Sequence, residues 1–334
     1  MDKEVTLVRD MLSQMVPGAA HHEAGLTLVP FFAAAPAKDY FLAAEAAGLG
    51  LIEIGEVGGG DVPNVVVQNK SELPVLLVDG EHLEGAKQNR IINVSALIAE
   101  RSRTILPVSC VEQGRWHYTG DASFAPSPDH AYAKLRRMQA ESSVVAARAG
   151  RERRPSQGAV WNEVSSKHQE MGVRSSSGAM RDSYEGHRGA LDAIQRAFSQ
   201  PEPGQTGVLA CIGGEPIVLD AFDRPDTLAK MWKRLVSGYA MDALTAATLK
   251  VPSGVAEEFM AQARGGEFSI HDAVGIGTDV VVTSPAVVGN ALAWDGGVVH
   301  LSLFGRSRSA GTTEAGGRIA TPVARRRMGR HFHS

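Results

Sequence analysis

The chain has 334 residues, of which 43% are hydrophobic and 21% are charged, and its formal net charge is −3 at pH 7. This composition is that of a globular protein with a sizeable core, in one large domain or two closely joined ones. The small net charge argues against nucleic acid as the main partner and against an anionic membrane surface. The N-terminus lacks the basic region of a signal peptide, and no apolar run reaches the roughly 20 residues of a membrane span. Cys110 and Cys211, the two cysteines, are far apart in sequence, so we expect a cytoplasmic protein without a disulfide framework.

Residues 25–120 alternate short apolar runs with turn residues, which is the pattern of β-strands. A single helix is predicted among them at 39–50, where an alanine-rich segment ends in a glycine that can cap it. We therefore expect this region to be β-rich. The predicted strands are 26–32, 51–57, 64–69, 73–78 and 103–112.

From about residue 129 the apolar period becomes that of α-helices. Helices are predicted at 129–150, 156–172 and 182–198. The last of them begins with Asp182 and Glu185, which have the spacing of a capping pair. Basic residues exceed acidic ones over 129–199, which leaves two interpretations open: a solvated helical surface, or a basic face for a phosphate-bearing partner.

Strands return after residue 205, beginning with a predicted hairpin that turns at Gly213 and Gly214. Because strands and helices are grouped rather than alternating, we expect an α+β fold, with a β-rich core formed by N- and C-terminal strands and a mainly helical middle segment. One domain is expected over 25–304, followed by a disordered basic tail at 305–334. The elements predicted in the last third are the hairpin at 207–222, helices at 225–249 and 253–264, and strands at 278–284, 286–294 and 297–304.

The stretch "DGEHLEGAKQNR" at 79–90 follows the apolar run at 73–78 and is the first candidate for chemistry. Its glycines can take positive φ in a turn, and Lys87 and Arg90 beside a glycine-containing loop suit a phosphate or carboxylate. Glu81 and Gln88 lie within the same stretch. Neither the dinucleotide fingerprint nor the Walker fingerprint occurs in the chain. The alternative is a hairpin loop with solvated charges.

The second candidate is "LPVSCVEQGRWHY" at 106–118. Glu112 lies on the same strand face as the apolar residues at 106, 108 and 110, so its side chain is expected to be partly buried at the strand end. A partly buried carboxylate needs a cation such as Arg90 or Arg115. Trp116 adds an indole that suits contact with a ring. We expect 79–90 and 112–116 to lie side by side, since each follows a buried strand and ends in charges that need partners. The alternative is a structural Glu–Arg bridge beside a core tryptophan.

Five further residues have weaker patterns. His82 and His117 lie near the two stretches without a metal-ligand spacing, so no metal site is expected. Cys110 is expected to be a core residue, because no basic residue lies beside it on its own strand face. On the long C-terminal helix, Tyr239 lies on the apolar stripe and Asp242 on its continuation. These two could support the candidate site, or Asp242 could bind a neighbouring cation or backbone donor.

The two stretches together resemble a bacterial family called ARG and rhodanese-phosphatase-superfamily-associated protein. The resemblance rests on "GE", on "GAKQNR" in the pattern G-x-x-Q-x-R, and on "CVEQGRW" in the pattern C-V-E-x-x-R-W. The later stretch "GGEPIVLDAFDRPDTLAKMWKRLVSGYAMDAL" looks like the second block of the family, so the resemblance covers roughly 25–300. The family name implies association with ADP-ribosylglycohydrolases, rhodaneses and phosphatases, and hence only by association ADP-ribose or NAD-derived compounds.

Two functions from different classes are compatible with these residues. In an enzyme, Glu81 and Glu112 would supply acid/base chemistry on a nucleotide-like or ADP-ribose-like substrate. Lys87, Gln88, Arg90 and Arg115 would hold its anionic groups, and Trp116 would cover a ring. In a binding or regulatory module, the same residues would recognise a metabolite or an ADP-ribosylated partner. A carboxylate separation of about 5–10 Å would favour hydrolysis, whereas a direct Glu–Arg bridge favours a structural role. No cofactor is assigned.

Overall fold

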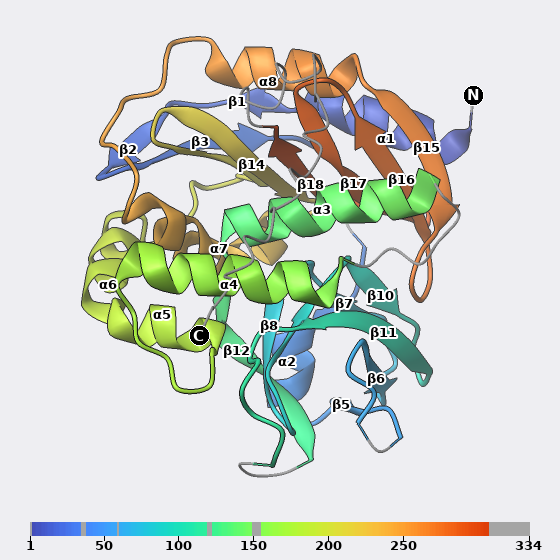
Figure 1. Cartoon of the computed structure of the whole chain (residues 1–334). Helices are drawn as coiled ribbons and strands as arrows, with labels where there is room; N and C mark the ends of the chain where they lie inside the picture. Colours follow the sequence, from blue (N-terminus) through green and yellow to red (C-terminus); the bar gives the residue numbers. More distant parts are fainter. Residues whose placement is uncertain (1, 35–37, 59, 119–121, 149–154, 307–334) are drawn as a thin grey trace, which may run out of the picture.

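The computed structural model describes residues 2–34, 38–58, 60–118, 122–148 and 155–306. The fold is α+β, as the sequence predicts. In the described residues the strands form a nine-stranded sheet, a closed barrel and a three-stranded sheet. Figure 1 shows the large sheet in the upper half of the molecule and the barrel in the lower half. Of the predicted basic tail at 305–334, Gly305 instead ends the last strand of the sheet, and residues 307–334 lie outside the described residues.

The nine-stranded sheet joins strands from both ends of the chain. Its strands are β1 (Val16–Pro17), β2 (His21–Glu23), β3 (Leu26–Phe32), β13 (Gly207–Ile212), β14 (Glu215–Phe222), β15 (Glu267–Asp272), β16 (Thr278–Thr283), β17 (Val287–Trp294) and β18 (Gly297–Gly305). The antiparallel pairing of β3 with β13 links the N-terminal strands to the C-terminal ones. The order is β1-β3-β13-β14-β18-β17-β16-β15, with β2 beside β3.

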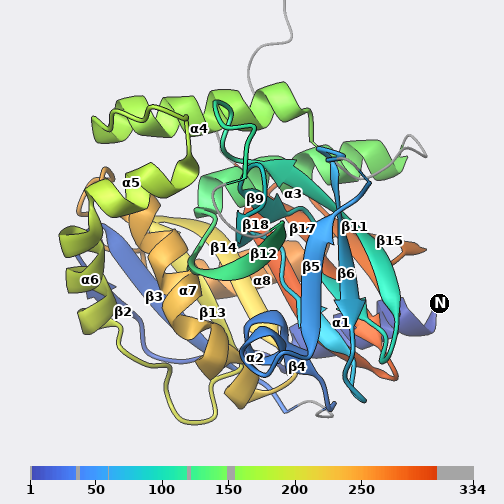
Figure 2. The same cartoon turned by 90° about the horizontal axis from the view of Figure 1, so that it is seen from below.

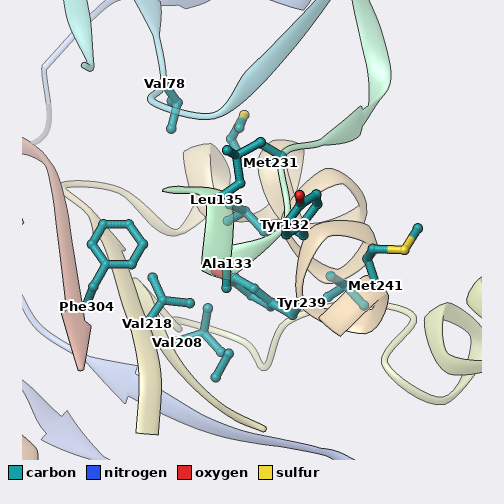
Figure 3. Packing of buried hydrophobic residues seen from close by; sticks show 14 of the residues in the cluster. Val78, Tyr132, Ala133, Leu135, Val208, Val218, Met231, Tyr239, Met241 and Phe304 are labelled. Carbon is teal, nitrogen blue, oxygen red and sulfur yellow. The ribbon is translucent and has the colours of Figure 1, made fainter. Parts of the chain in front are cut away.

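Helices cover both faces of this sheet, which explains why every residue of β13 and β18 is buried. α1 (Lys3–Gln14) and α8 (Val255–Arg264) pack on one face, and α3 (Ala133–Arg148) and α7 (Pro225–Ala243) pack on the other (Figure 1). Between α3, α7 and the sheet lies the largest hydrophobic cluster, in which Leu135, Tyr239 and Val218 take part (Figure 3). Burial of this apolar surface stabilises the fold by about 25 cal/mol per Å² removed from water.

The barrel holds a separate core. Its strands are β5 (Ile52–Glu56), β6 (Asn64–Asn69), β8 (Glu81–Gly85), β9 (Arg90–Ile92), β11 (Arg103–Cys110) and β12 (Ser123–His130). They close in the order β11-β6-β5-β12-β8-β9 around side chains such as Ile54, Val67 and Leu83. Beside the barrel lie the short sheet β10-β7-β4 and one helix (Figures 1 and 2). Their bounds are β4 (Phe41–Leu42), α2 (Ala43–Gly48), β7 (Val75–Leu77) and β10 (Ala96–Ile98).

The remaining helices are α4 (Gln157–Met171), α5 (Met180–Gly186) and α6 (Arg188–Ala197), and they lie beside the barrel and α7. The predicted helix at 182–198 is therefore wrong in one respect, since it is broken into α5 and α6 at His187, whose φ is −122°. The predicted capping pair is also wrong: α5 begins at Met180, and the Asp182 carboxylate accepts a hydrogen bond from Ser175 instead. Among the described helices, none is both long and apolar enough to cross a membrane.

The stretch 79–90 is a strand pair rather than a loop, because most of it forms β8, a short turn and β9 inside the barrel. Gly85 has a φ of +131°, and a Cβ atom there would lie 2.4 Å from the carbonyl oxygen of Ser123, so only glycine fits. Gly80 has a φ of +84° and is similarly crowded by Arg136. The glycines thus allow β12 and α3 to approach β8. The sequence pattern also missed α1, β12 and β15.

Candidate functional site

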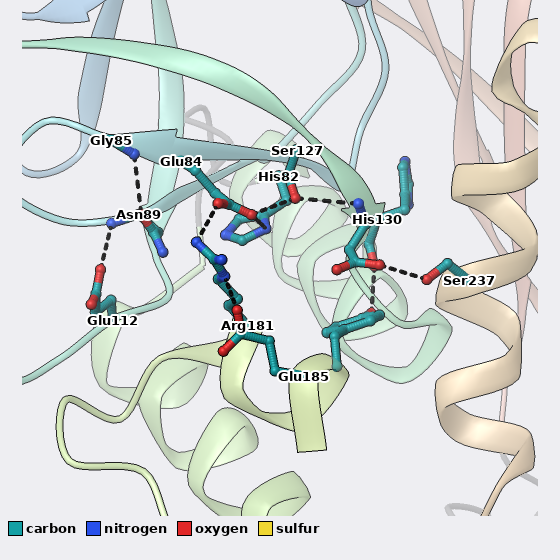
Figure 4. Close-up of polar contacts among 12 residues, drawn as sticks. His82, Glu84, Gly85, Asn89, Glu112, Ser127, His130, Arg181, Glu185 and Ser237 are labelled. Atoms are coloured by element: carbon teal, nitrogen blue, oxygen red, sulfur yellow. Dashed lines mark hydrogen bonds and ion pairs between the residues drawn. The ribbon is translucent and has the colours of Figure 1, made fainter. Parts of the chain in front are cut away.

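The two candidate stretches lie side by side at one end of β8. Arg115 forms an ion pair with Glu112 across 2.7 Å (Nη2 to Oε2), and both side chains are less than a tenth exposed. The same carboxylate oxygen accepts the Asn89 N–H at 3.1 Å (Figure 4). Burial opposes ionisation of Glu112, but the hydrogen bonds from Arg115 and Asn89 outweigh it, so the pKa of this carboxyl lies below its ordinary value. Glu112 is therefore held as a paired carboxylate.

The side chains of Arg115 and Gln88 also donate hydrogen bonds to backbone carbonyl oxygens, which join the two stretches further. The guanidinium of Arg115 donates to the carbonyl oxygens of Gly85 at 3.2 Å and Ala86 at 2.7 Å. The side-chain amide of Gln88 donates to the carbonyl oxygen of Glu112 at 2.9 Å. Both side chains are buried, so their hydrogen-bonding groups hold the turn between β8 and β9 against the end of β11. We call the set Gln88, Asn89, Glu112 and Arg115 the turn clamp.

Arg90 is buried more deeply still, at 1% exposure. Its Nη1 donates to the carbonyl oxygens of Gln88 at 3.1 Å and Asn89 at 3.3 Å, and no carboxylate of the described chain forms an ion pair with it. Burial lowers the pKa of this guanidinium. Cys110 is fully buried, as the sequence predicts, and Arg90 lies opposite it in the β9–β11 pair. The neighbour comes from the next strand, which strand alternation cannot indicate.

Glu81 lies at the other end of β8 from the turn clamp. Its carboxylate accepts the Val78 N–H at 2.8 Å and lies 3.7 Å from the Arg234 guanidinium. Burial raises its pKa, with Arg234 opposing the shift. Four strand steps from Glu81 to Gly85 span roughly 13 Å, so Glu81 lies well along β8 from the turn that Arg115 binds. Each of the two expected acid/base residues has its own arginine neighbour, Arg234 for Glu81 and Arg115 for Glu112.

A buried charge cluster occupies this second end of β8. The Arg136 guanidinium, from α3, donates to Asp79 at 3.0 Å and to both oxygens of Asp220 at 2.6 and 2.8 Å. His300 lies 3.7 Å from Asp79 and 3.6 Å from Asp220, and the Tyr239 hydroxyl donates to Asp220. Burial would raise the pKa of Asp220, but Arg136 more than reverses this and holds it well below its ordinary value. We call these five residues the Arg136 cluster.

The Arg136 cluster contains a ligand set that could hold a metal, because donor atoms of Asp79, Asp220 and His300 all lie within 4.8 Å of one another. Both carboxylates, however, already bind the guanidinium of Arg136. A second cation at the same place would be repelled by the first. The residues therefore do not fit a metal, and the cluster ties the segment after β7 to α3 and the large sheet.

Tyr239 and Asp242, proposed to support a site with Glu81 and Glu112, belong to different contacts. Tyr239 is a member of the Arg136 cluster. Asp242 accepts the Lys134 N–H at 2.8 Å and the Lys167 ammonium at 2.7 Å, which fastens α7 to α3 and α4. This is the alternative that the sequence left open for Asp242.

A polar seam between the barrel and α5 was not foreseen (Figure 4). Arg181 bridges Glu84 at 2.7 Å and Glu185 at 2.6 Å. Beneath it, His82 is 1% exposed, and its Nδ1 lies 3.6 Å from Glu84. Burial lowers the pKa of His82, with Glu84 opposing the shift. Arg181 and Glu84 are 97 residues apart in the chain, so no local pattern could have paired them.

Two aromatic side chains of the second candidate stretch are open to solvent, as are its polar residues Gln113 and His117. Trp116 is 50% and Tyr118 46% exposed, although such large side chains are usually buried. The Lys87 ammonium lies 5.3 Å from the centroid of each ring. Glu56 accepts a hydrogen bond from the Tyr118 hydroxyl at 3.0 Å and lies 3.6 Å from the Lys87 ammonium. The Glu56 carboxylate therefore holds the side chains of Tyr118 and Lys87 in place. We call Lys87, Trp116 and Tyr118 the aromatic platform; the sequence pointed to Lys87 and Trp116 but missed Tyr118 and Glu56.

One region of the chain matches a known family. This region includes the barrel strands, the turn clamp, β13, β14 and α7. The model of the ARG and Rhodanese-Phosphatase-superfamily-associated Protein domain matches residues 14–304. The chain belongs to this family. The match extends over most of the chain and includes β1 and β2, which precede the region on which the sequence resemblance rested. No curated protein and no solved structure matches the chain.

Proposed function

We propose that the protein binds a small ligand with an aromatic ring and an anionic group, of the ADP-ribose or nucleotide kind, on the aromatic platform. The observation that carries the proposal is the position of the Lys87 ammonium 5.3 Å from two half-exposed rings. Trp116 or Tyr118 would stack on the base, which is worth about 1–3 kcal/mol per stacked base. Lys87 would contact the phosphate.

The turn clamp supports this binding by keeping the platform rigid. Trp116 directly follows Arg115, whose guanidinium is fixed by Glu112 and by the carbonyl oxygens of the β8–β9 turn. Lys87 belongs to that same turn, and its backbone N–H donates to Glu56 at 3.2 Å. A ligand-binding surface whose side chains are held in place loses less conformational entropy on binding.

Binding without hydrolysis by Glu81 and Glu112 is the function that the geometry favours. Glu112 is bridged directly to Arg115, and Glu81 is buried about 13 Å along the strand. Two carboxylates that cleave a glycosidic bond must instead flank it at about 5–10 Å. We also propose a cytoplasmic setting, because Cys110 and Cys211 are both free thiols. An ADP-ribosylated partner would present the same ring and phosphates as the free compound.

Titration calorimetry with ADP-ribose and with adenosine tests the proposal. Trp116→Ala should weaken binding of both compounds by roughly 1–3 kcal/mol, because the ring is lost. Lys87→Ala should weaken ADP-ribose but not adenosine, which has no phosphate. Ile105→Ala is the matched control, since Ile105 is another exposed apolar side chain of the barrel, at 57% exposure.

Absence of measurable binding of either compound to the wild-type protein, or equal affinities of the Trp116 and Ile105 variants, would reject the proposal. The reaction mixture should also be examined for released products. Turnover that disappears in Glu112→Gln would restore the acid/base role that the geometry disfavours.

A further inference from the structure

The basic side chains of α3 to α7 are mostly engaged with neighbours. Arg136 and Lys167 are buried in ion pairs, and Arg188 binds both oxygens of Asp129 at 2.8 and 2.7 Å. Arg196, in the last turn of α6, and Lys233, on α7, differ from them. Both are exposed, and within the described chain their side chains make no hydrogen bond or ion pair.

Arg196 and Lys233 line the same hollow between α6 and α7. This hollow has a volume of about 370 Å³, and Asp192 is the acidic residue on its wall. A second hollow of about 190 Å³ continues past the end of α6 and shares Phe198 and Ser199 with the first. Small-molecule sites typically have volumes of about 300–1,000 Å³, so the two hollows together form a groove of suitable size.

The two ends of the groove differ in chemistry. Arg196 and Lys233 outnumber Asp192 at one end, which makes that end cationic. The other end is lined by Phe198 and Trp232, together with apolar residues of β3. At its far rim Glu202 is hydrogen-bonded to His21 at 2.9 Å. An anion is therefore favoured at the α6–α7 end, and an apolar group at the β3 end.

The walls of the groove are fixed to each other. The Gln195 side-chain amide donates to the carbonyl oxygen of Lys233 at 3.0 Å, which ties α6 to α7. The Trp232 indole N–H donates to the carbonyl oxygen of Phe198 at 2.7 Å, which holds the end of α6 over the apolar end. The spacing of the two cations is thus set by packed helices rather than by a loop.

We propose that this groove is a second ligand site, which binds a small amphiphilic anion. The carboxylate, sulfonate or phosphate of the ligand lies between Arg196 and Lys233, and its ring or aliphatic chain lies against Phe198 and Trp232. The site is independent of the aromatic platform: α6 and α7 lie on one side of the molecule, and the barrel strands β5 and β6 lie on the other (Figures 1 and 2).

The probe for this site is 8-anilinonaphthalene-1-sulfonate, which has an aromatic body and one anionic group and becomes fluorescent in apolar surroundings. The native wild-type protein should bind it saturably. The double variant Arg196→Ala/Lys233→Ala should bind at least about tenfold more weakly, because charge-assisted hydrogen bonds are lost. The charge-preserving variant Arg196→Lys/Lys233→Arg should retain most of the affinity. Lys70→Ala/Lys230→Ala is the control, since it removes the same charge from exposed lysines elsewhere.

Two further variants locate the bound probe. Ser199→Trp fills the point shared by both hollows and should abolish binding. Trp116→Ala should leave it unchanged, which separates this site from the aromatic platform. Near-ultraviolet circular dichroism confirms that each variant is folded. The proposal is overturned if the wild-type protein does not bind saturably, if Ser199→Trp still binds, or if the double alanine variant matches its control. Arg196 would then serve only to offset the dipole at the end of α6.

Discussion

The two ends of β8 have the same kinds of residue but differ in access to solvent. At the Glu81 end, the Arg136 cluster joins a guanidinium to two carboxylates at 2.6–3.0 Å, and every member is at least nine-tenths buried. At the Gly85 end, Arg115 and Glu112 form a similar pair at 2.7 Å, and the half-exposed rings of Trp116 and Tyr118 follow Arg115 in the chain. A charged motif can therefore be purely internal. The exposed aromatic side chains near the second motif, rather than its charges, are what the proposed ligand would contact.

The comparison also shows what buried ion pairs contribute. Removing charges from water is costly, so such a pair adds little net stability compared with an apolar core, but removing one partner leaves an uncompensated buried charge. Both ends of β8 should thus be sensitive to single substitutions. The Arg136 cluster should be the more sensitive, since two carboxylates depend on one guanidinium there.

Arg136→Met should have the largest effect, because Asp79 and Asp220 would be left buried without their cation. We expect a loss of about 3–5 kcal/mol in the free energy of unfolding, measured by urea denaturation. Arg101→Met is the control, since both Arg101 and its partner Glu72 are exposed and surface ion pairs contribute little to stability. Similar losses in the two variants would show that the Arg136 cluster is not the stronger contact.

Glu112→Gln should have a smaller effect, about 1.5–3 kcal/mol at pH 7, because a charge-assisted hydrogen bond to Arg115 is lost while the shape is kept. The pKa of Glu112 is lowered on folding, so its contribution is present above its unfolded pKa of 4.5 and is lost as the pH falls through the folded value. The difference between wild type and variant should therefore shrink below pH 4. A difference that stays constant down to low pH would contradict this assignment.

Glu81→Gln should show the opposite pH dependence. The pKa of Glu81 is raised by burial, so its contribution to stability is greatest below its unfolded pKa of 4.5 and is lost as the pH rises through the folded value. Relative to wild type, the variant should gain stability between pH 4 and pH 8. Urea denaturation at the two pH values measures it. A relative loss at pH 8 would show that Arg234, 3.7 Å away, dominates instead.

Trp116→Ala should have the smallest effect on stability, within about 0.5 kcal/mol, because half of the ring is already exposed and truncation opens no core cavity. The same variant is expected to lose ligand affinity. A substitution in the aromatic platform should therefore reduce binding while leaving the free energy of unfolding nearly unchanged. A loss of more than 1.5 kcal/mol in urea denaturation would instead make Trp116 part of the packing around the turn clamp.

Local patterns in the sequence determined much of the secondary structure. The apolar runs at 26–32 and 64–69 are strands with the predicted bounds, and the glycine pair at 213–214 turns the predicted hairpin. These patterns succeed because side-chain period and turn residues act over a few positions. They fail where local signals conflict. In β12, prolines at 126 and 128 obscured a strand whose register with β8 shifts between Pro126 and His130.

Which charged residues would meet was decided by the tertiary structure. The sequence placed Glu112 beside a cation and put 79–90 next to 112–116, because Arg115 is three residues from Glu112 and both stretches follow strands. It could not show that Arg234 is the neighbour of Glu81, or that Arg136 holds Asp79 and Asp220 from 57 and 84 residues away. The sequence by itself therefore determined the α+β class, the family resemblance and the local Glu–Arg pair. The barrel closure and the packing of α3 and α7 on the sheet decided which charges are sealed inside and which rings face solvent, because those contacts depend on how distant segments pack.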